Sequence, residues 1–412
     1  MILKKLYGPP QKSYFLLRTI FYILLLLTVP FATEIVADAA PSMLPKGITV
    51  NNGPQTYHGY TVFSVQGKDK VFVIDMEGNT VHSWHIPGVS AQFKPLPNGH
   101  ILVIVSTIPN YRIALREYDW DGNLVWEFPL PPKFQSFNHD VARLQNGNTL
   151  TIASVEKTIP EFIPRPIIDS VIVEVNTAGE IVWEWSALEH YEELGLSQEA
   201  KEYLNSHPAI VDVFHTNSVQ ALPPNNFENT DSRFKAGNIL ISQRHTSRLL
   251  IVDRATGSVV WSAEPTIAQH HASMIPPSLQ GGGNILVFDN GGSAGYPPRL
   301  RPYSIVEEIN PVTTEVVWKY EALDNNRAPD TFFSLIRSSA QRLPNGNTLI
   351  VESTFGRIFE VTSLKKIVWE YVSPYFRQDY NGFRTNQIYR AYRVDYTWPT
   401  GKVGPGEELF VW

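Results

Sequence analysis

The chain contains no cysteine among its 412 residues. It therefore has no disulfide, no thiolate ligand for a metal and no cysteine that could carry a lipid. A protein of this size can still fold without disulfides, because 43% of its residues are hydrophobic and can form a large buried core. The length exceeds what one compact core usually supports, so a repeat array or a barrel is expected.

The sequence also lacks a basic stripe. Its net charge is −6, and the 34 basic and 40 acidic residues are mixed along the chain, so nucleic acid is not an expected partner. Long helices are not indicated, because 31 prolines and 26 glycines divide the chain into short segments. This punctuation is typical of strands joined by turns and predicts an all-β fold.

The N-terminal apolar run is short for a membrane span. The run Thr19–Ala32 follows several basic residues, and Ala37–Ala39 fits the small-X-small pattern of a cleavage site. A spanning helix needs about 20 apolar residues. Residues 1–40 are therefore predicted to be a signal peptide that directs the chain to the periplasm or out of the cell, with no stable membrane span after cleavage. An uncleaved N-terminal anchor is the alternative.

A tryptophan recurs at equivalent points from residue 57 onward. In each copy a strand ends in a polar residue, usually Asp or Asn, a turn follows, and the next strand carries the tryptophan. A flat aromatic side chain on an outer strand packs between neighbouring sheets, so these residues are expected to be core rather than a ligand site. The six copies are Trp84, Trp126, Trp183, Trp261, Trp318 and Trp369.

A second element, Leu-X-Asn-Gly, alternates with the first. It occurs at 96–99, 144–147 and 343–346, with looser copies at 236–240 and 282–286. Asn-Gly between two apolar runs predicts a hairpin with a type I′ turn, in which both central residues have positive φ. Together the two elements indicate units of four short antiparallel strands.

Six such units predict a six-bladed β-propeller over residues 41–412. Ile388–Val394 alternates like an inner strand but has no Asn-Gly turn after it. We expect it to complete the blade begun at residues 57–84, so that strands from the two ends of the chain close the ring. The segment 187–206 interrupts the repeat and is predicted to be a small helical insertion with a cap at Ser197.

Polar residues stand at the head of the first strand in several repeats, where folding alone does not require them. When the blades are aligned on the Leu or Ile before the turn, His139 and His270 coincide. Asn217 takes that place in the blade between them, with His215 on the same strand face. The first strand of each blade lines the central channel of a propeller, so these side chains are expected to converge on one mouth. Residues at or near the equivalent point in other blades are Gln92, Lys94 and Arg337.

Two kinds of chemistry fit clustered imidazoles. Neutral histidines, together with Asp140, could bind zinc, copper or iron. A neutral imidazole could instead attack as a nucleophile in group transfer. Arg244, expected on the second strand of the blade that holds His215, favours the second reading, because a guanidinium repels a cation and binds an oxyanion such as sulfate or phosphate. His245 and Asp289 are expected to be structural.

These motifs resemble those of the arylsulfate sulfotransferases, the PAPS-independent arylsulfotransferase family, over most of the chain after the signal segment. The clearest parts are Phe214–Ser218, Ile241–Arg244, and Gln269–His270 followed by Gly283–Gly291, with 137–140 resembling an earlier histidine motif. The resemblance implies a six-bladed propeller that moves a sulfuryl group from a phenolic sulfate to a phenol. It implies a transiently sulfated histidine, and no nucleotide, metal or other cofactor.

The same resemblance implies roles for individual residues. His270 matches the nucleophile, with the adjacent His271 as the alternative. His215 and Arg244 match groups that hold the sulfuryl oxygens, and His139 matches a second histidine acting on the phenolic oxygen. The residues expected to bind substrate are Asn217, His271 and Arg337.

Two other functions stay open at this point. A non-catalytic propeller would bind an anionic or aromatic ligand, or a partner protein, at the same mouth without turnover. A metal-dependent oxidase or hydrolase would use the histidines as ligands. No motif indicates an oligomeric state.

Overall fold

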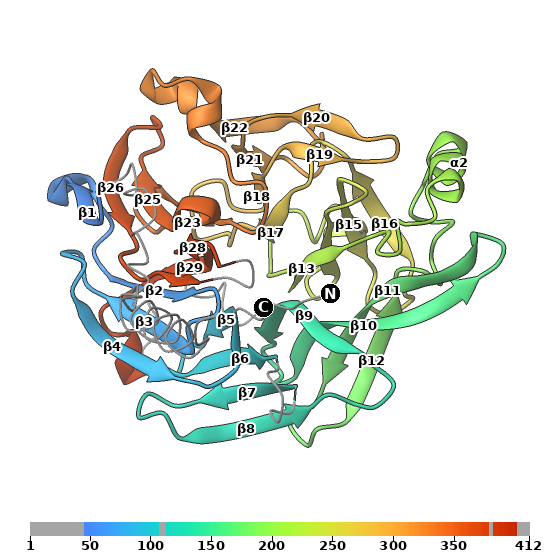
Figure 1. Ribbon diagram of the computed structural model, residues 1–412, viewed down its shortest axis with the longest axis horizontal. Helices are drawn as coiled ribbons and strands as arrows, with labels where there is room; N and C mark the ends of the chain where they lie inside the picture. Colours follow the sequence, from blue (N-terminus) through green and yellow to red (C-terminus); the bar gives the residue numbers. More distant parts are fainter. Residues whose placement is uncertain (1–44, 107–112, 379–381, 402–412) are drawn as a thin grey trace, which may run out of the picture. The chain divides into compact units, whose positions relative to one another are not determined.

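The structure, a computed structural model, describes residues 45–106, 113–378 and 382–401, apart from the side chains of 89–91. The chain divides into the units Met1–Met43 and Leu44–Trp412, and the predicted signal peptide, residues 1–40, lies outside the described residues. The described part of the second unit forms six antiparallel sheets of four strands, one of them extended by a fifth (Figure 1). The prediction of an all-β, six-bladed propeller is confirmed.

Each blade runs outward from an inner strand, and the inner strands of neighbouring blades contact one another. From inner to outer strand, the blades are β29-β2-β3-β4 (Ile388–Val394, Tyr60–Val65, Lys70–Ile74, Thr80–His85), β5–β8 (Val89–Pro95, Ile101–Val105, Ala114–Tyr118, Leu124–Pro129), β9–β12 (Ser136–Arg143, Thr149–Ile159, Ile163–Val175, Ile181–Ser186), β13–β16 (Thr216–Ala221, Ile239–Gln243, Arg248–Val252, Val259–Ala263), β17-β18-β21-β22 (His270–Met274, Ile285–Asp289, Ile305–Ile309, Val316–Tyr320) and β23–β26 (Ser339–Arg342, Thr348–Glu352, Arg357–Val361, Ile367–Val372) followed by β1 (Gly47–Asn51). Smaller elements are the hairpins β19–β20 (Gly292–Ala294, Arg299–Arg301) and β27–β28 (Arg377–Gln378, Arg384–Thr385), the helix α2 (Gln198–Ser206) and the 3₁₀ turns Gly53–Gln55, Ser232–Phe234, Ala322–Asn325, Pro329–Thr331, Ser353–Phe355 and Trp398–Thr400.

The Asn-Gly turns join the first and second strands of their blades, as predicted, but they are not type I′ turns. After β5, the Gly99 N–H donates to the Leu96 carbonyl (3.0 Å), and the Leu96 N–H donates to the His100 carbonyl (2.9 Å). Gly99 has a φ of 80°, whereas Asn98 does not have a positive φ. Asn98 acts through its side chain, because its Oδ1 accepts the His100 N–H (3.2 Å). The loop is a type I turn completed by one left-handed glycine, and the prediction of two positive-φ residues was wrong.

The outer-strand tryptophans join each blade to the next. The Nε1 of Trp84 donates to the Asp119 carbonyl (2.7 Å), which lies in the turn between the outer strands of the following blade. In the third blade the predicted Trp183 is replaced in this role by Trp185, which donates to the Gly257 carbonyl (2.8 Å). Residues i and i+2 share one face of a strand, so alternation could not distinguish the two. The equivalent donors in the remaining blades are Trp126, Trp261, Trp318 and Trp369.

The apolar core consists of six clusters, each between two neighbouring blades. In one of them, Val71 and Val73 of the blade that contains β3 pack with Ile101 and Val103 of the next blade. Both faces of every sheet are therefore covered without a single central core. This division explains how a chain too long for one core buries its apolar residues.

Strands from both ends of the described chain close the ring. β29 pairs with β2, with Val394 opposite Tyr60, so the predicted mixed blade is confirmed. A second closure was not predicted: β1 adds to the outer edge of β26, with Asn51 opposite Trp369. The Trp369 Nε1 also donates to the Met76 carbonyl (3.0 Å) in the mixed blade. The last and first blades are thus held together by strand pairing and by the same tryptophan contact as the other blades.

The segment after β12 forms the predicted helical insertion. Turns precede α2, and the Ser197 Oγ accepts the Ala200 N–H (3.1 Å), which confirms the predicted N-terminal cap. Leu188, Leu194 and Leu204 are buried in the cluster between the third and fourth blades, so the insertion packs onto the propeller. Within the described ranges, no helix has both the length and the apolar composition that crossing a membrane would take.

Candidate functional site

Three of the predicted site residues lie on or beside inner strands: His139 within β9, His215 directly before β13 and His270 at the start of β17. The pairing of each strand is irregular there. The β9–β10 register shifts across His139 and Asp140, and equivalent shifts occur in the other two blades. His139, His215 and His271 have φ values of 63°, 49° and 51°. An extra residue re-aims a side chain away from regular alternation, and left-handed non-glycine residues are concentrated at functional sites. These bulges place the imidazoles.

The hydrogen bonds around His270 define its tautomer. The Asn290 Nδ2 donates to the carbonyls of Ser334 (2.7 Å) and Arg337 (3.0 Å), so the Asn290 Oδ1 faces His270. The His270 Nδ1 lies 2.8 Å from that oxygen and donates its proton to it. The His270 Nε2 then carries the lone pair and accepts the Arg337 N–H at 3.2 Å. The network holds His270 with an unprotonated Nε2.

Burial and charge keep His270 neutral. Burial, followed by the nearby Arg244 guanidinium, lowers the pKa of His270 well below its ordinary range. Arg244 itself lies one residue beyond the end of β14, in the turn rather than on the predicted second strand. Its Nη2 donates to the Leu335 carbonyl (3.4 Å), and its Nε has no partner among the described residues. A guanidinium with an unused donor beside a neutral imidazole suits an oxyanion.

His139 lies beside His215 and is also held neutral. Their ring centroids are 4.7 Å apart. The His139 Nδ1 lies 2.8 Å from the Tyr389 hydroxyl. Burial, and then the proximity of His215, lowers the pKa of His139 well below its ordinary range, while burial raises the pKa of Tyr389 to about 12. His139 and Tyr389 are therefore both uncharged at neutral pH.

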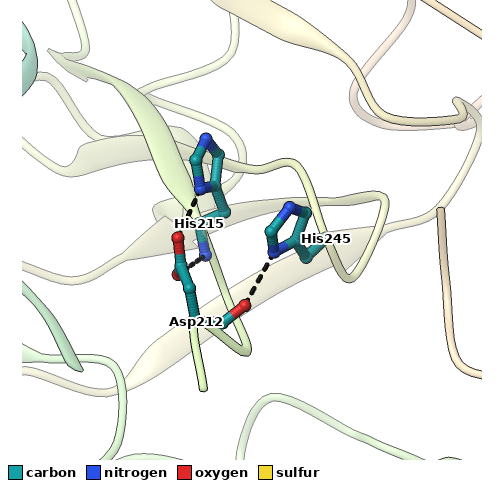
Figure 2. Close-up of side chains that lie close together, drawn as sticks. All are labelled: Asp212, His215 and His245. Atoms are coloured by element: carbon teal, nitrogen blue, oxygen red, sulfur yellow. Dashed lines mark hydrogen bonds and ion pairs between the residues drawn. The ribbon is translucent and has the colours of Figure 1, made fainter. Parts of the chain in front are cut away.

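Asp212 and His245, neither of them predicted as a site residue, complete the group around His215 (Figure 2). One Asp212 carboxylate oxygen accepts the His215 N–H (3.0 Å) and the other accepts from the His215 Nδ1 (2.5 Å). The Asp212 carbonyl accepts from the His245 Nδ1 (2.7 Å), and the two imidazoles stack at a centroid distance of 4.5 Å. Asp212 thus positions two imidazoles. The structural role expected for His245 did not include this contact with a site residue.

Asp212 and His245 differ in charge at neutral pH. Burial alone would raise the pKa of Asp212, but the hydrogen bond from His215 and the nearby imidazoles of His215, His245 and His139 together hold that pKa below its ordinary value. Burial, followed by His215, lowers the pKa of His245 to about 4. Asp212 is therefore a carboxylate and His245 a neutral imidazole at neutral pH. The spacing Asp212-X-X-His215 was the one sequence signal for this pair, because it allows a turn to bring both side chains together.

Asp212, His215 and His245 could also hold a metal ion, since their ligand atoms lie within 4.8 Å of one another. Both Nδ1 atoms, however, already donate to Asp212, and a cation bound there would have to replace these hydrogen bonds. Arg244 is close enough for its charge to interact with Asp212, and it opposes a cation. The donor set fits a metal by residue type, whereas its hydrogen bonds and the neighbouring guanidinium fit an anion better.

Two of the predicted substrate-binding residues contact the His270 segment through hydrogen bonds. Asn217 is fully buried, and its Nδ2 donates to the Gln269 carbonyl (2.7 Å), directly before His270. Arg337 offers its backbone N–H to His270, while its guanidinium donates to the Gln387 Oε1. Both residues therefore position the imidazole of His270.

The third predicted substrate-binding residue, His271, lies apart from this group. His271 lines a separate cavity, away from the contacts of Asn217 and Arg337, and its part in substrate binding stays a prediction. Asp140, considered as a metal ligand, pairs instead with Arg390 (2.5 Å). Asp289 is structural, as expected, but it ends β18 rather than standing in a turn, and it pairs with Arg301 (2.7 Å).

The chain is similar in fold to a solved structure of low sequence identity. A protein of unknown function from Bacteroides caccae aligns over 81% of this chain and 98% of its own, with a TM-score of 0.52 and 15% identity. A streptogramin B lyase aligns over 85% of this chain and 93% of its own, with a TM-score of 0.45 and 12% identity. At these identities the likeness concerns the fold alone.

The family comparison is more informative than the structural one. No curated protein matches the chain. A family model described as arylsulfotransferase (ASST) matches residues 130–374, more than half of the chain. That span contains His139, His215, Arg244 and His270. The match supports arylsulfotransferase activity in general, and the chain belongs to the arylsulfotransferase (ASST) family.

Proposed function

We propose that the protein transfers a sulfuryl group from an aryl sulfate to a phenol through a sulfated His270, without PAPS. The observation that carries the proposal is the network in which Asn290 accepts the Nδ1 proton and leaves the Nε2 unprotonated, so that a substrate need displace only the Arg337 N–H (3.2 Å) from its lone pair. A neutral imidazole of fixed tautomer is a competent nucleophile, because the attacking nitrogen carries no proton that must first be removed. The nearby Arg244 supplies the charge that a sulfuryl group needs.

The two half-reactions balance without a cofactor. In the first, the His270 Nε2 forms an N–S bond while the S–O bond to the aryl oxygen breaks, and the bonding pair leaves with the phenolate. In the second, the acceptor oxygen forms a new S–O bond, the N–S bond breaks, and the neutral imidazole returns. The leaving phenolate gains a proton and the acceptor phenol loses one, so the cycle consumes none. We assign the proton of the acceptor to His139, which is held neutral and can take it as a base, while the leaving phenolate takes its proton from water.

The remaining side chains act on charge and orientation. Sulfuryl transfer, like phosphoryl transfer, proceeds through a loose transition state with charge on the equatorial and leaving oxygens. Arg244 and His215 are assigned to those oxygens, because Arg244 lies close enough to His270 to lower its pKa and His215 lies beside His139, with ring centroids 4.7 Å apart. Asn217 and Arg337 keep the His270 segment in place.

Intact mass spectrometry tests this proposal directly. After exposure to an aryl sulfate without acceptor, the protein should gain about 80 Da, the mass of one SO₃ group, as expected for a covalent intermediate. His270→Ala should gain nothing, whereas His271→Ala, the matched control in the separate cavity, should still gain the adduct. An adduct on folded His270→Ala would contradict the assignment. Saturable binding by the wild type without adduct or phenol release would support the non-catalytic alternative.

A metal-dependent function is the second candidate, favoured by the ligand atoms of Asp212, His215 and His245 lying within 4.8 Å of one another. It predicts stoichiometric zinc, iron or copper in protein purified without added metal. It also predicts that chelation abolishes turnover. Full phenol release by metal-free protein would exclude it.

We also propose that the protein is exported, on the strength of the short apolar run Thr19–Ala32 and the small residues after it. The mature protein, recovered from the periplasm or the medium, should lack residues 1–40 by intact mass. A membrane-bound protein of full mass would support the anchor instead.

A further inference from the structure

A small cavity of about 20 Å³ lies where all six inner strands of the propeller meet. Each inner strand contributes at least one lining residue, which places the cavity on the propeller axis. The residues with ionisable or aromatic side chains among them are Lys94, Asp140, His271 and Tyr392. A space of this volume holds one water molecule or one monatomic ion, and it is too small for a sulfate or a phenol.

Lys94 is the unexplained group in this cavity. It is only 8% exposed, and its ammonium makes no hydrogen bond or ion pair with the described residues. Its Nζ lies 5.5 Å from the centroid of the Tyr392 ring, and its charge interacts favourably with Asp140 and unfavourably with Arg390. Burial lowers the pKa of Lys94 to about 8, so most of the side chain is still charged at neutral pH. A largely buried ammonium is destabilising unless its charge is balanced by a partner.

The neighbouring charges do not supply that partner. Asp140 is the one acidic residue in the lining, and its Oδ1 accepts from Arg390 (2.5 Å) and from the Val141 N–H (3.0 Å). Its Oδ2 accepts the Val219 N–H (3.1 Å). The carboxylate is therefore balanced by Arg390, and the charge of Lys94 is left over.

His271 provides a second unused group beside the cavity. It is 6% exposed, and its Nδ1 has no hydrogen-bond partner in the described part of the chain. Burial, followed by the charges of Arg390 and Lys94, lowers the pKa of His271 well below its ordinary range, so it does not add a positive charge. Its other ring nitrogen hydrogen-bonds the Ala340 backbone, so the unpartnered Nδ1 is an acceptor and His271 contributes neither a charge nor a donor to an anion in the cavity.

We propose that this cavity binds a single monatomic anion, chloride under ordinary conditions, as the counter-ion of Lys94. The anion would cancel the one unpaired charge of the axis and occupy a space that larger anions cannot enter. This site is distinct from the proposed sulfuryl site around Arg244, and it does not depend on the sulfotransferase function.

Bromide locates the site directly. Crystals grown in sodium bromide should show an anomalous peak in contact with the Lys94 Nζ, on the axis between β5 and β17. A water molecule there, with bromide only on the surface, would overturn the proposal. This arm uses the wild-type protein and stands even if a variant fails to fold.

Thermal unfolding gives the second arm. Replacing sodium methanesulfonate by sodium chloride at constant ionic strength should raise the Tm of the wild type by at least about 2 °C, because an ion bound only by the folded state stabilises it. Lys94→Met keeps the length of the side chain without its charge and should lose this shift. Lys70→Met, which changes an exposed lysine on β3, is the matched control and should keep it. An equal chloride response in both variants would refute the site.

Discussion

Replacing Asp212 by Asn asks whether the carboxylate positions His215 for the reaction. Both Asp212 oxygens accept from His215, one from the backbone N–H (3.0 Å) and one from the Nδ1 (2.5 Å). Asparagine has the same shape but offers one acceptor and one donor. One of the two His215 N–H groups would then face the NH₂ group of the asparagine and lose its hydrogen bond. Losing one charge-assisted hydrogen bond costs about 1.5–3 kcal/mol. If His215 acts in the transition state, kcat/KM should fall roughly 10–150-fold.

The assay is release of a chromogenic phenol from its sulfate, with kcat and KM measured separately and combined in a double-mutant cycle. If Asp212 acts only through His215, adding Asp212→Asn to His215→Asn should cause no further loss. Asp231→Asn, which removes a carboxylate paired with Arg233 (2.6 Å), is the control and should keep full activity. The reasoning is refuted if Asp212→Asn retains the wild-type kcat/KM, or if the two losses add.

Other consequences concern ring closure and pH. Trp369→Phe removes a buried donor to the Met76 carbonyl and should lower the free energy of unfolding by about 2–4 kcal/mol in urea titrations. Trp318 occupies the equivalent place in its blade but is only half-buried, so Trp318→Phe should lower the free energy of unfolding by less than half as much. Because burial and Arg244 hold the pKa of His270 well below 6.5, kcat/KM for the donor should stay level from about pH 8 to about pH 6, and an acid limb near 6.5 would argue against His270. Burial likewise lowers the pKa of His139 and His271. Below about pH 6.5 the unfolded chain therefore binds more protons than the folded chain, and the free energy of unfolding should fall by up to about 1.4 kcal/mol per pH unit for each histidine.

The blade pattern was readable from the sequence because each blade repeats the same local requirements. A glycine at the left-handed position of the first turn and a tryptophan on the outer strand recur with the repeat, and both depend on nearby residues. The added strand β1 could not be predicted in the same way. Gly47–Asn51 carries no motif, and its partner Ile367–Val372 lies more than 300 residues further along the chain. Such pairing is decided by which sheet edge is left open when the ring closes.

The candidate site was predictable only where it follows the repeat. His139 and His270 occupy equivalent strand positions, so alignment of the blades finds them. Asp212 stands outside the repeat, between the helical insertion and β13, and its partnership with His215 depends on a turn. His245 was expected to be structural, because its stacking on the His215 ring depends on the fold and is not reflected in the sequence spacing. Contacts made by the segments between repeats are therefore the part that required the structure.

The choice between His270 and His271 rests on the backbone rather than on the chemistry of either imidazole. Both side chains are buried, and both have a pKa well below the ordinary range, so nucleophilicity alone does not separate them. The register of β17 shifts between His270 and Ser273, and His271 takes a left-handed φ of 51°. The bulge places His270 against Asn290 and Arg337, and places His271 beside the axial cavity. Two adjacent imidazoles of similar pKa therefore contact different groups, and only His270 has its tautomer defined by an amide side chain.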